Sequence, residues 1–261
     1  KTRLELSSTV HVETSGGWSK KAQFFRIKRL GLKLIKQNNI EEITTQDPFF
    51  TGLVGWLLKR KFKLKLEVQM HGDFFSVQGG SALGGGGYYR RQYLKLFLAK
   101  FILKRADVIR VVGERVKQSL LNLVISEDKI LVKPVVINHE FIKNYQPKIN
   151  LHNKYLGYEK IFLVLGRLDP VKNIPWLVET FKEVVKQKNY LLLIVGSGTE
   201  EPRLRLQVTS YKLQNNIKFI CWTNDSYGYL KTADCVLFPS LSEGYGLVPM
   251  EASIVGTSVI M

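Results

Sequence analysis

The sequence has few cysteines and no long apolar run. Cys221 and Cys235 are the only cysteines among 261 residues. Two cysteines cannot form a disulfide framework, so a reducing, cytoplasmic compartment is expected. The longest apolar stretch without charge runs from Pro48 to Leu58, well short of the ~20 residues that a membrane-spanning helix needs. No apolar segment follows the basic first residues, which argues against a signal peptide.

Acidic residues are scarce only in the first part of the chain. Residues 1–155 carry 28 Lys and Arg against 12 Asp and Glu, whereas residues 156–261 carry 11 against 10. Such asymmetry favours an anionic partner for the first part, namely a membrane surface, a nucleic acid or a phosphorylated acceptor. A merely solubilising surface is the alternative.

Two expected basic helices, at residues 19–37 and 89–104, would suit anionic lipid headgroups. Peripheral docking at the inner membrane face is therefore a hypothesis for this otherwise cytoplasmic protein. The basic residues concerned are Lys20, Lys21, Arg26, Lys28, Arg29, Arg90, Arg91, Lys95, Lys100, Lys104 and Arg105.

Apolar runs of strand length alternate with stretches of helical periodicity along the chain. Strands are expected at residues 42–46, 64–70, 107–112, 130–137, 160–165, 190–195, 217–220 and 235–238. Further helices are expected at residues 49–58, 114–123, 173–186, 200–213, 225–232 and 247–254. Continuous apolar strands separated by helices predict parallel sheets covered on both faces.

This order predicts an α/β protein with two Rossmann-like, doubly wound domains facing each other across a cleft. A polar segment at residues 144–158 separates them, so we expect domains at residues 1–150 and 151–261. A glycine-rich run at residues 78–87 interrupts the first domain. A phosphate-binding loop is one reading, but the Lys-Ser/Thr pair of a P-loop is absent, which favours a mobile loop bordering the cleft.

Glycines and cations follow the first two strands of the second domain. Gly166 ends the first strand, and Arg167 and Lys172 come soon after it. A guanidinium can hold a phosphate with two hydrogen bonds, and an ammonium adds a point charge. Two solvated loop cations are the alternative. Gly196 and Gly198 form a similar turn after the next strand, although such turns are also common connectors.

Two glutamates and two glycines follow the strand at residues 235–238. Gly244 and Gly246 permit close backbone approach to a ligand, and the amides of residues 246–248 are helix-start donors. Glu243 precedes the expected helix and Glu251 lies one turn into it, so both can face one ligand. Carboxylates suit sugar hydroxyls, while the cations suit a diphosphate. Acids that merely complement the helix dipole are the alternative.

These loops together resemble the retaining glycosyltransferases of family 4, GT-B enzymes that use UDP-, GDP- or ADP-sugars. The shared pattern is G-R-L-x-x-x-K at residues 166–172, a glycine turn at 196–198, and E-G-x-G with a second glutamate at 243–251. Residues 216–222 resemble the family's strand before the base-binding edge, with Cys221 where glycine is usual. Residues 45–50, 70–73, 106–114 and 130–138 resemble the first domain more loosely.

The resemblance implies that the second domain binds the nucleotide and the first domain the acceptor. It implies that Arg167 and Lys172 stabilise the leaving diphosphate, Glu251 the ribose, and Glu243 the donor sugar. His71 would contact the sugar from the opposite wall, unless it is a structural strand-end histidine. The candidate catalytic residues are Glu243, Arg167, Lys172 and His71, and the candidate donor-binding residues are Gly166, Gly196, Gly198, Phe219, Cys221, Trp222, Gly244, Tyr245, Gly246, Leu247 and Glu251.

The expected activity is transfer of a sugar from a nucleotide sugar to a glycan or lipid-linked acceptor, with retention and without metal or other cofactor. A GT-B nucleotide-sugar epimerase is an alternative. A nucleic-acid-binding module is disfavoured, because the sequence contains no recognised nucleic-acid-binding module. The resemblance covers residues 40–261. It implies that the family's first strand would precede Lys1 and its closing elements would follow Met261, so both ends are expected to be incomplete.

Overall fold

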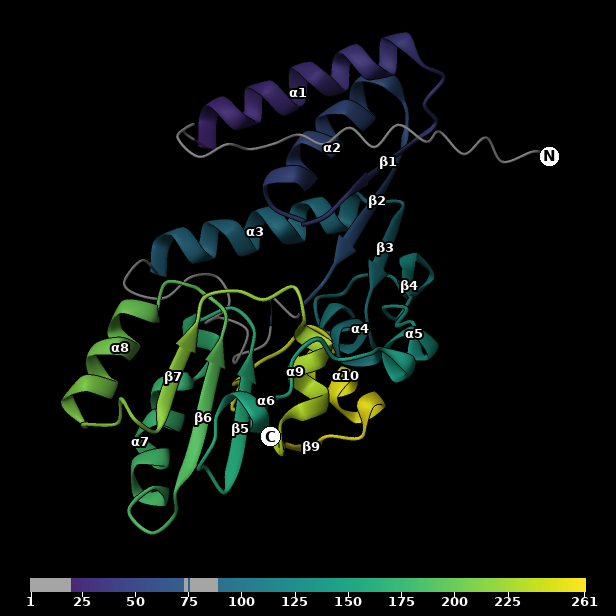
Figure 1. Cartoon of the computed structure of the whole chain (residues 1–261). Helices are drawn as coiled ribbons and strands as arrows, with labels where there is room; N and C mark the ends of the chain where they lie inside the picture. The colour runs from purple at the N-terminus through teal and green to yellow at the C-terminus, as the bar shows by residue number, and fades with distance from the viewer. Residues whose placement is uncertain (1–19, 73–74, 76–88) are drawn as a thin grey trace.

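The computed structural model describes residues 20–72, 75 and 89–261 (Figure 1). Within them, the first sheet has the strand order β1-β2-β3-β4. Its strands are β1 (Glu42–Thr45), β2 (Lys65–Met70), β3 (Val108–Val111) and β4 (Ile130–Val132), and all its pairings are parallel. The glycine-rich run at residues 78–87 lies outside the described residues.

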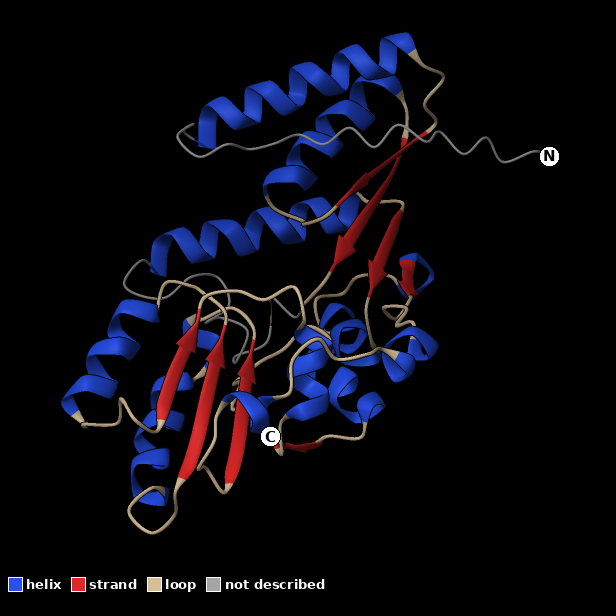
Figure 2. Ribbon diagram, viewed as in Figure 1, coloured by secondary structure: helices blue, strands red, loops and turns tan. Residues whose placement is uncertain are grey.

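The second sheet has the order β7-β6-β5-β8-β9 and is also parallel. Its strands are β5 (Lys160–Leu165), β6 (Tyr190–Val195), β7 (Ile217–Ile220), β8 (Cys235–Leu237) and β9 (Ser258–Ile260). The arrowheads of the two sheets point toward each other (Figure 2). The strand order reverses at β5, and ligands of open α/β sheets bind outside the carboxyl ends of the strands at such a point.

Helices connect the strands. They are α1 (Lys20–Gln37), α2 (Phe50–Phe62), α3 (Tyr89–Arg105), α4 (Glu114–Leu121), α5 (His139–Asn144), α6 (Leu151–Lys154), α7 (Ile174–Val184), α8 (Glu201–Ser210), α9 (Ser226–Thr232) and α10 (Leu247–Val255). Short 3-10 helices cover Glu127–Lys129 and Pro170–Lys172. The predicted fold class, two doubly wound parallel-sheet domains, is confirmed.

Some predicted elements differ from the structure. The strand predicted at residues 130–137 is wrong beyond Val132: the Lys133 amide makes a last bond to the Val111 carbonyl, and Pro134 has no N–H to continue the ladder. β9 was not predicted as a strand. Neither were α5 and α6, short helices capped by the side chains of Asn138 and Asn150.

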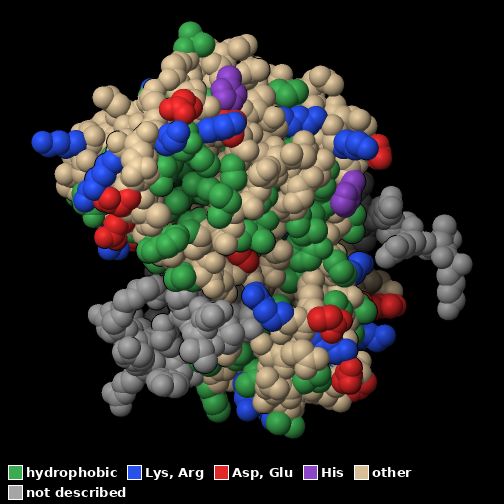
Figure 3. All heavy atoms as spheres, turned by 90° about the horizontal axis from the view of Figure 1, so that it is seen from below, with side chains coloured by type: hydrophobic (Ala, Val, Ile, Leu, Met, Phe, Trp, Pro, Cys, Tyr) green, Lys and Arg blue, Asp and Glu red, His purple; other side chains and the backbone are tan. Residues whose placement is uncertain are grey.

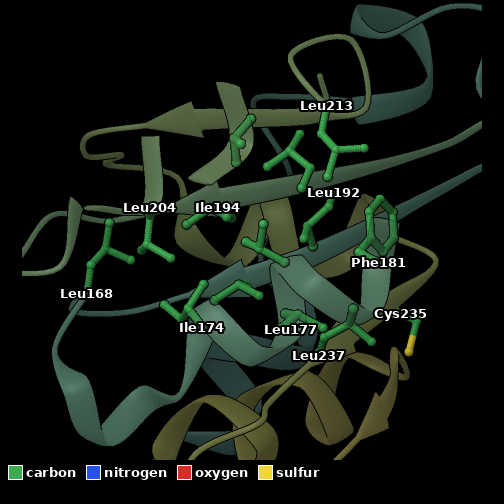
Figure 4. Close-up of a cluster of buried hydrophobic side chains, with 14 residues drawn as sticks. Leu168, Ile174, Leu177, Phe181, Leu192, Ile194, Leu204, Leu213, Cys235 and Leu237 are labelled. Atoms are coloured by element: carbon green, nitrogen blue, oxygen red, sulfur yellow. The ribbon is translucent and has the colours of Figure 1, made fainter. Parts of the chain in front are cut away.

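The central strands β5 and β6 are covered on both faces, which explains why they are almost entirely apolar. Along β6, Leu192 and Ile194 join one core cluster, which Figure 4 shows with side chains from α7 and α8. Leu191, Leu193 and Val195 join the cluster on the opposite face. The first sheet packs around its own cluster. Each domain therefore has an independent core, while the predicted boundary at residue 150 stays a prediction.

Charges of both signs are mixed on the face of the molecule seen from below (Figure 3). This face belongs mainly to the second domain, whose segment is nearly neutral, with 11 basic and 10 acidic residues. The positive excess therefore lies in the segment that forms the first domain, as the sequence indicates.

Asp234 immediately precedes β8, at the amino-terminal end of the second sheet, and links this strand to β5. Asp234 pairs with Lys160 at 2.9 Å and with His152 at 3.0 Å, and accepts the Ile161 amide at 2.8 Å. Burial acts to raise the pKa of Asp234, but these hydrogen bonds and charges outweigh burial and hold the pKa below its ordinary value. A lowered folded-state pKa means that the stabilisation is complete above pH 3.8, the ordinary value, and is lost as the pH falls through the folded value.

We expect Asp234→Asn to lower the free energy of unfolding by about 1 kcal/mol at neutral pH, because solvent at this edge weakens the ion pairs. Urea denaturation at several pH values checks this, and the difference from wild type should shrink below pH 3.8. The exposed Glu183, paired with Lys186, offers a control, since Glu183→Gln should leave unfolding unchanged. Equal effects of the two variants would contradict the prediction.

Candidate functional site

A pocket of about 370 Å³ lies at the carboxyl ends of β5 and β6. Gly166 and Arg167 line it from the first loop and Gly196 from the second, and Trp222 closes it from the segment after β7. Four of the sequence-predicted donor-site residues therefore meet in one place. The backbone of Gly196 has φ 141°, and a side chain there would stand 1.9 Å from the Gly166 carbonyl oxygen, so the two loops can touch only because residue 196 is glycine.

Three other candidate donor-binding residues do not line this pocket. Phe219 packs against the core beside α8, with the Arg205 guanidinium 4.6 Å from its ring centroid. Cys221 is exposed but does not line the pocket. Gly198 packs against the Leu168 backbone. A direct role in donor binding remains a prediction for all three.

A second pocket, of about 550 Å³, lies beside the loop between β8 and α10. Glu243, Tyr245 and Gly246 line it from this loop, and Trp176 lines it from α7. Arg115, from α4 of the first domain, lines it as well. The third predicted motif therefore borders both domains.

Lys172 and Glu243 form a partly buried ion pair. Lys172 Nζ lies 2.6 Å from Glu243 Oε1, and the two side chains are 18% and 27% exposed. The Leu241 amide donates to the Val171 carbonyl at 2.9 Å, which joins the two loops next to the ion pair. The first and third predicted motifs are thus in direct contact.

Arg167 lies near this pair but is much more exposed than Lys172. Its side chain is 82% exposed and has one acidic partner, Asp169, at 3.1 Å. Arg167 and Lys172 both line a small cavity of about 10 Å³ that shares residues with the two pockets. A diphosphate that spans the two pockets would therefore lie beside both Arg167 and Lys172.

The start of α10 supplies further anion-binding groups. Gly246 precedes the helix with φ 74°. Among the described residues, no protein acceptor meets the amides of Leu247 and Val248. Pro249 has no N–H, so Leu247 and Val248 supply the donors that the described part of the chain leaves unpaired in this turn. Free amides and the helix dipole favour negative charge at this point.

Glu251 is a residue of α10, and its side chain contacts α9. It lines neither pocket. The Tyr227 hydroxyl donates to its Oε1 at 3.3 Å. Burial raises the pKa of Glu251, and the weaker effect of the Tyr227 hydrogen bond does not offset it. Ser226, the residue before Tyr227, lines the first pocket, so Glu251 lies close behind that pocket.

The first domain meets the glutamate loop from the other side. His71 follows β2, and its Nε2 shares a hydrogen bond of 2.8 Å with Gln46 Oε1. A side chain on Gly244 would stand 1.8 Å from the His71 carbonyl oxygen, so the two backbones are in contact. His71 therefore lies beside the glutamate loop, and its contact with a sugar stays a prediction.

Two residues at this junction were missed by sequence reasoning. Gln46 orients the His71 ring, and the Arg115 guanidinium donates to the Glu243 main-chain oxygen. Both follow strands of the first sheet, so their positions at strand ends were the available signal. Nothing in the sequence shows which residues of the second domain they meet.

Two further observations concern metals and membranes. In the parts of the chain that the structure describes, no three His, Cys, Asp or Glu side chains gather as a metal site would require. No described helix has both the length and the apolar character needed to cross a bilayer.

Comparison with known proteins places these loops in a family context. Residues 148–261 match the family model described as glycosyl transferases group 1. The chain is 25% identical over 241 residues to alpha-monoglucosyldiacylglycerol synthase of Streptococcus pneumoniae, covering 88% of this chain and 53% of that protein. It is 27% identical over 240 residues to UDP-Gal:alpha-D-GlcNAc-diphosphoundecaprenol alpha-1,3-galactosyltransferase of Escherichia coli, covering 88% and 59%. The chain thus spans little more than half the length of these relatives.

A solved structure shows the same fold. The structure of HepE from Anabaena in complex with UDP and glucose matches with a TM-score of 0.71 and 16% identity, over 91% of this chain and 62% of that one. The chain therefore has the GT-B fold, and its residues 148–261 carry the sequence pattern of the glycosyl transferases group 1 family.

Proposed function

We propose that the protein transfers a hexosyl group from a nucleotide sugar to a glycan or lipid-linked acceptor. One observation carries the proposal: Arg167 and Lys172 lie between two adjacent pockets at the carboxyl ends of the second sheet, and Lys172 contacts Glu243. Cations beside carboxylates suit a ligand that joins a diphosphate to a sugar. The family match over the same residues supports this interpretation.

Each group has a distinct task in the proposed reaction. Arg167, Lys172 and the amides at the start of α10 stabilise the negative charge that develops on the leaving diphosphate. Glu243 accepts hydrogen bonds from the donor sugar and Glu251 from the ribose. His71, held by Gln46, contacts the sugar from the first domain.

Retention of anomeric configuration and independence from metal are parts of the same proposal. The resemblance to family 4 supports retention. Two cations and two free helix-start amides offer the charge neutralisation that a divalent ion supplies in other transferases. The bound UDP and glucose of the Anabaena protein support a UDP-sugar as the donor.

A panel of nucleotides tests the donor site. We expect one of UDP, GDP and ADP, and the matching sugar nucleotide, to raise the melting temperature of the full-length gene product, with or without EDTA. Arg167→Ala or Glu251→Ala should abolish that shift. No shift with any of the nucleotides would contradict the proposed function. Turnover of the sugar nucleotide without any acceptor would instead indicate an epimerase.

A lipid-linked acceptor and an anionic membrane surface are the proposed partners of the first domain. The two curated relatives are named for transfer to a diacylglycerol lipid and to a diphosphoundecaprenol lipid. On α1 and α3, exposed apolar side chains lie among basic ones: Phe25 is 66% exposed, Leu94 68% and Phe97 69%. Exposed apolar groups beside cations suit the headgroup region of a bilayer.

Liposome flotation tests the membrane partner. We expect the protein to float with vesicles that contain phosphatidylglycerol and to stay in the soluble fraction with neutral phosphatidylcholine vesicles. The double variant Arg26→Glu, Arg29→Glu in α1 should float less. The double variant Lys186→Glu, Lys188→Glu, at two exposed positions of the second domain, is the charge-matched control. Equal flotation with both kinds of vesicle would remove the electrostatic interpretation.

A further inference from the structure

Arg115 links the two domains through a single contact. It is the second residue of α4, and its guanidinium donates to the main-chain oxygen of Glu243. Among the described residues, Arg115 has no acidic side chain as a partner. A cation in the first turn of a helix is disfavoured by the helix dipole, so the stability of α4 does not account for an arginine here.

The loop that Arg115 contacts is held at every residue from 243 to 245. Lys172 holds the carboxylate of Glu243 at 2.6 Å while Arg115 binds its carbonyl oxygen. Gly244 lies against the His71 backbone. Tyr245 packs against the core cluster of the first domain. The loop therefore belongs to the second domain by sequence and to the first domain by most of its contacts.

We propose that Arg115 is a positioning residue, which fastens the loop at residues 243–246 to the first domain. The proposal rests on the proposed function. Because one residue, Glu243, is held by a cation from each domain, the carboxylate takes up its place beside Lys172 only while Arg115 holds the backbone. The free amides of Leu247 and Val248 come directly after this loop. Arg115 therefore also sets their position.

Arg115→Ala should separate the chemical step from donor binding. The first pocket is lined by second-domain residues, so we expect the dissociation constant for UDP, measured by calorimetry, to change less than about twofold. We expect kcat to fall about 30-fold, the size of a lost charge-assisted hydrogen bond made in the reactive arrangement. Arg115→Lys, which keeps one donor, should recover part of kcat.

Hydrogen exchange provides a readout that needs no substrate. In Arg115→Ala, the Leu241 amide, which donates to the Val171 carbonyl, should exchange about tenfold faster than in wild type, while β5 and β6 keep their protection. Lys117→Ala is the matched control: it removes a positive charge from the same helix, where Lys117 pairs with Glu127. This control should change neither the exchange nor kcat.

The results distinguish this proposal from the proposed function. An unchanged kcat and unchanged loop exchange in Arg115→Ala would overturn the role of Arg115 alone. Faster exchange throughout both domains would also overturn it, because the residue would then be needed for folding in general. A wild-type protein that neither binds nucleotides nor transfers sugar would overturn the proposed function, yet loop exchange would still test the contact.

Discussion

Lys172→Ala is expected to lower kcat about 10³-fold, the upper range for removal of one group that stabilises developing charge. Lys172 is the less exposed of the two cations, at 18% against 82% for Arg167, so water screens its charge less. The substitution also leaves Glu243 without its partner at 2.6 Å. A free carboxylate would then face the diphosphate and repel it.

Steady-state kinetics with the sugar nucleotide that stabilises the wild-type protein would measure this effect. We expect kcat to fall much more than KM rises, because the lysine acts mainly on the charge that develops as the bond to the diphosphate breaks. Lys186→Ala removes an exposed lysine that pairs with Glu183 on the same domain and should leave kcat unchanged. A decrease of kcat of less than about tenfold for Lys172→Ala would show that Lys172 does not stabilise the charge that develops on the diphosphate.

Gly244→Ala is expected to lower kcat about 10²-fold while each domain stays folded, because a displacement of about 1 Å at a reacting group costs that much. The new methyl group would stand 1.8 Å from the His71 carbonyl oxygen and 3.3 Å from Gly72 Cα. Both obstacles are backbone, so the glutamate loop must move away from the first domain. The separate cores of the domains do not include this contact, and the melting temperature should change little.

Gly113→Ala is the control for this substitution. Gly113 precedes α4 in an extended conformation, and an added side chain there meets no atom within 4 Å. Nucleotide binding by the Gly244→Ala variant, followed by calorimetry, should stay within about threefold of wild type, since the loss concerns alignment rather than affinity. Wild-type kcat in Gly244→Ala would mean that the domains do not meet at this glycine during the reaction.

The sequence predicted the second domain better than the first for a physical reason. β5 and β6 lie at the predicted residues, because strands that are covered on both faces are nearly continuous apolar runs. β4 was predicted too long because Val135, Val136 and Ile137 look like strand residues, whereas Pro134 ends the hydrogen-bond ladder. β9 is only three residues long and mostly exposed, so its sequence pattern gives little evidence of a strand.

The sequence by itself determined that two parallel-sheet domains form, and that Arg167, Lys172 and Glu243 lie at strand ends, because parallel strands bring their carboxyl ends to one edge. Only the tertiary structure decided how these residues meet: the 2.6 Å pairing of Lys172 with Glu243, the packing of Phe219 against the core, and the place of Glu251 beside Tyr227. It also decided that Gly244 touches His71 and that Arg115 holds Glu243. Local sequence pattern reflects burial and backbone conformation within one element, whereas these contacts join residues up to 173 positions apart, and only packing within and between the two domains sets them.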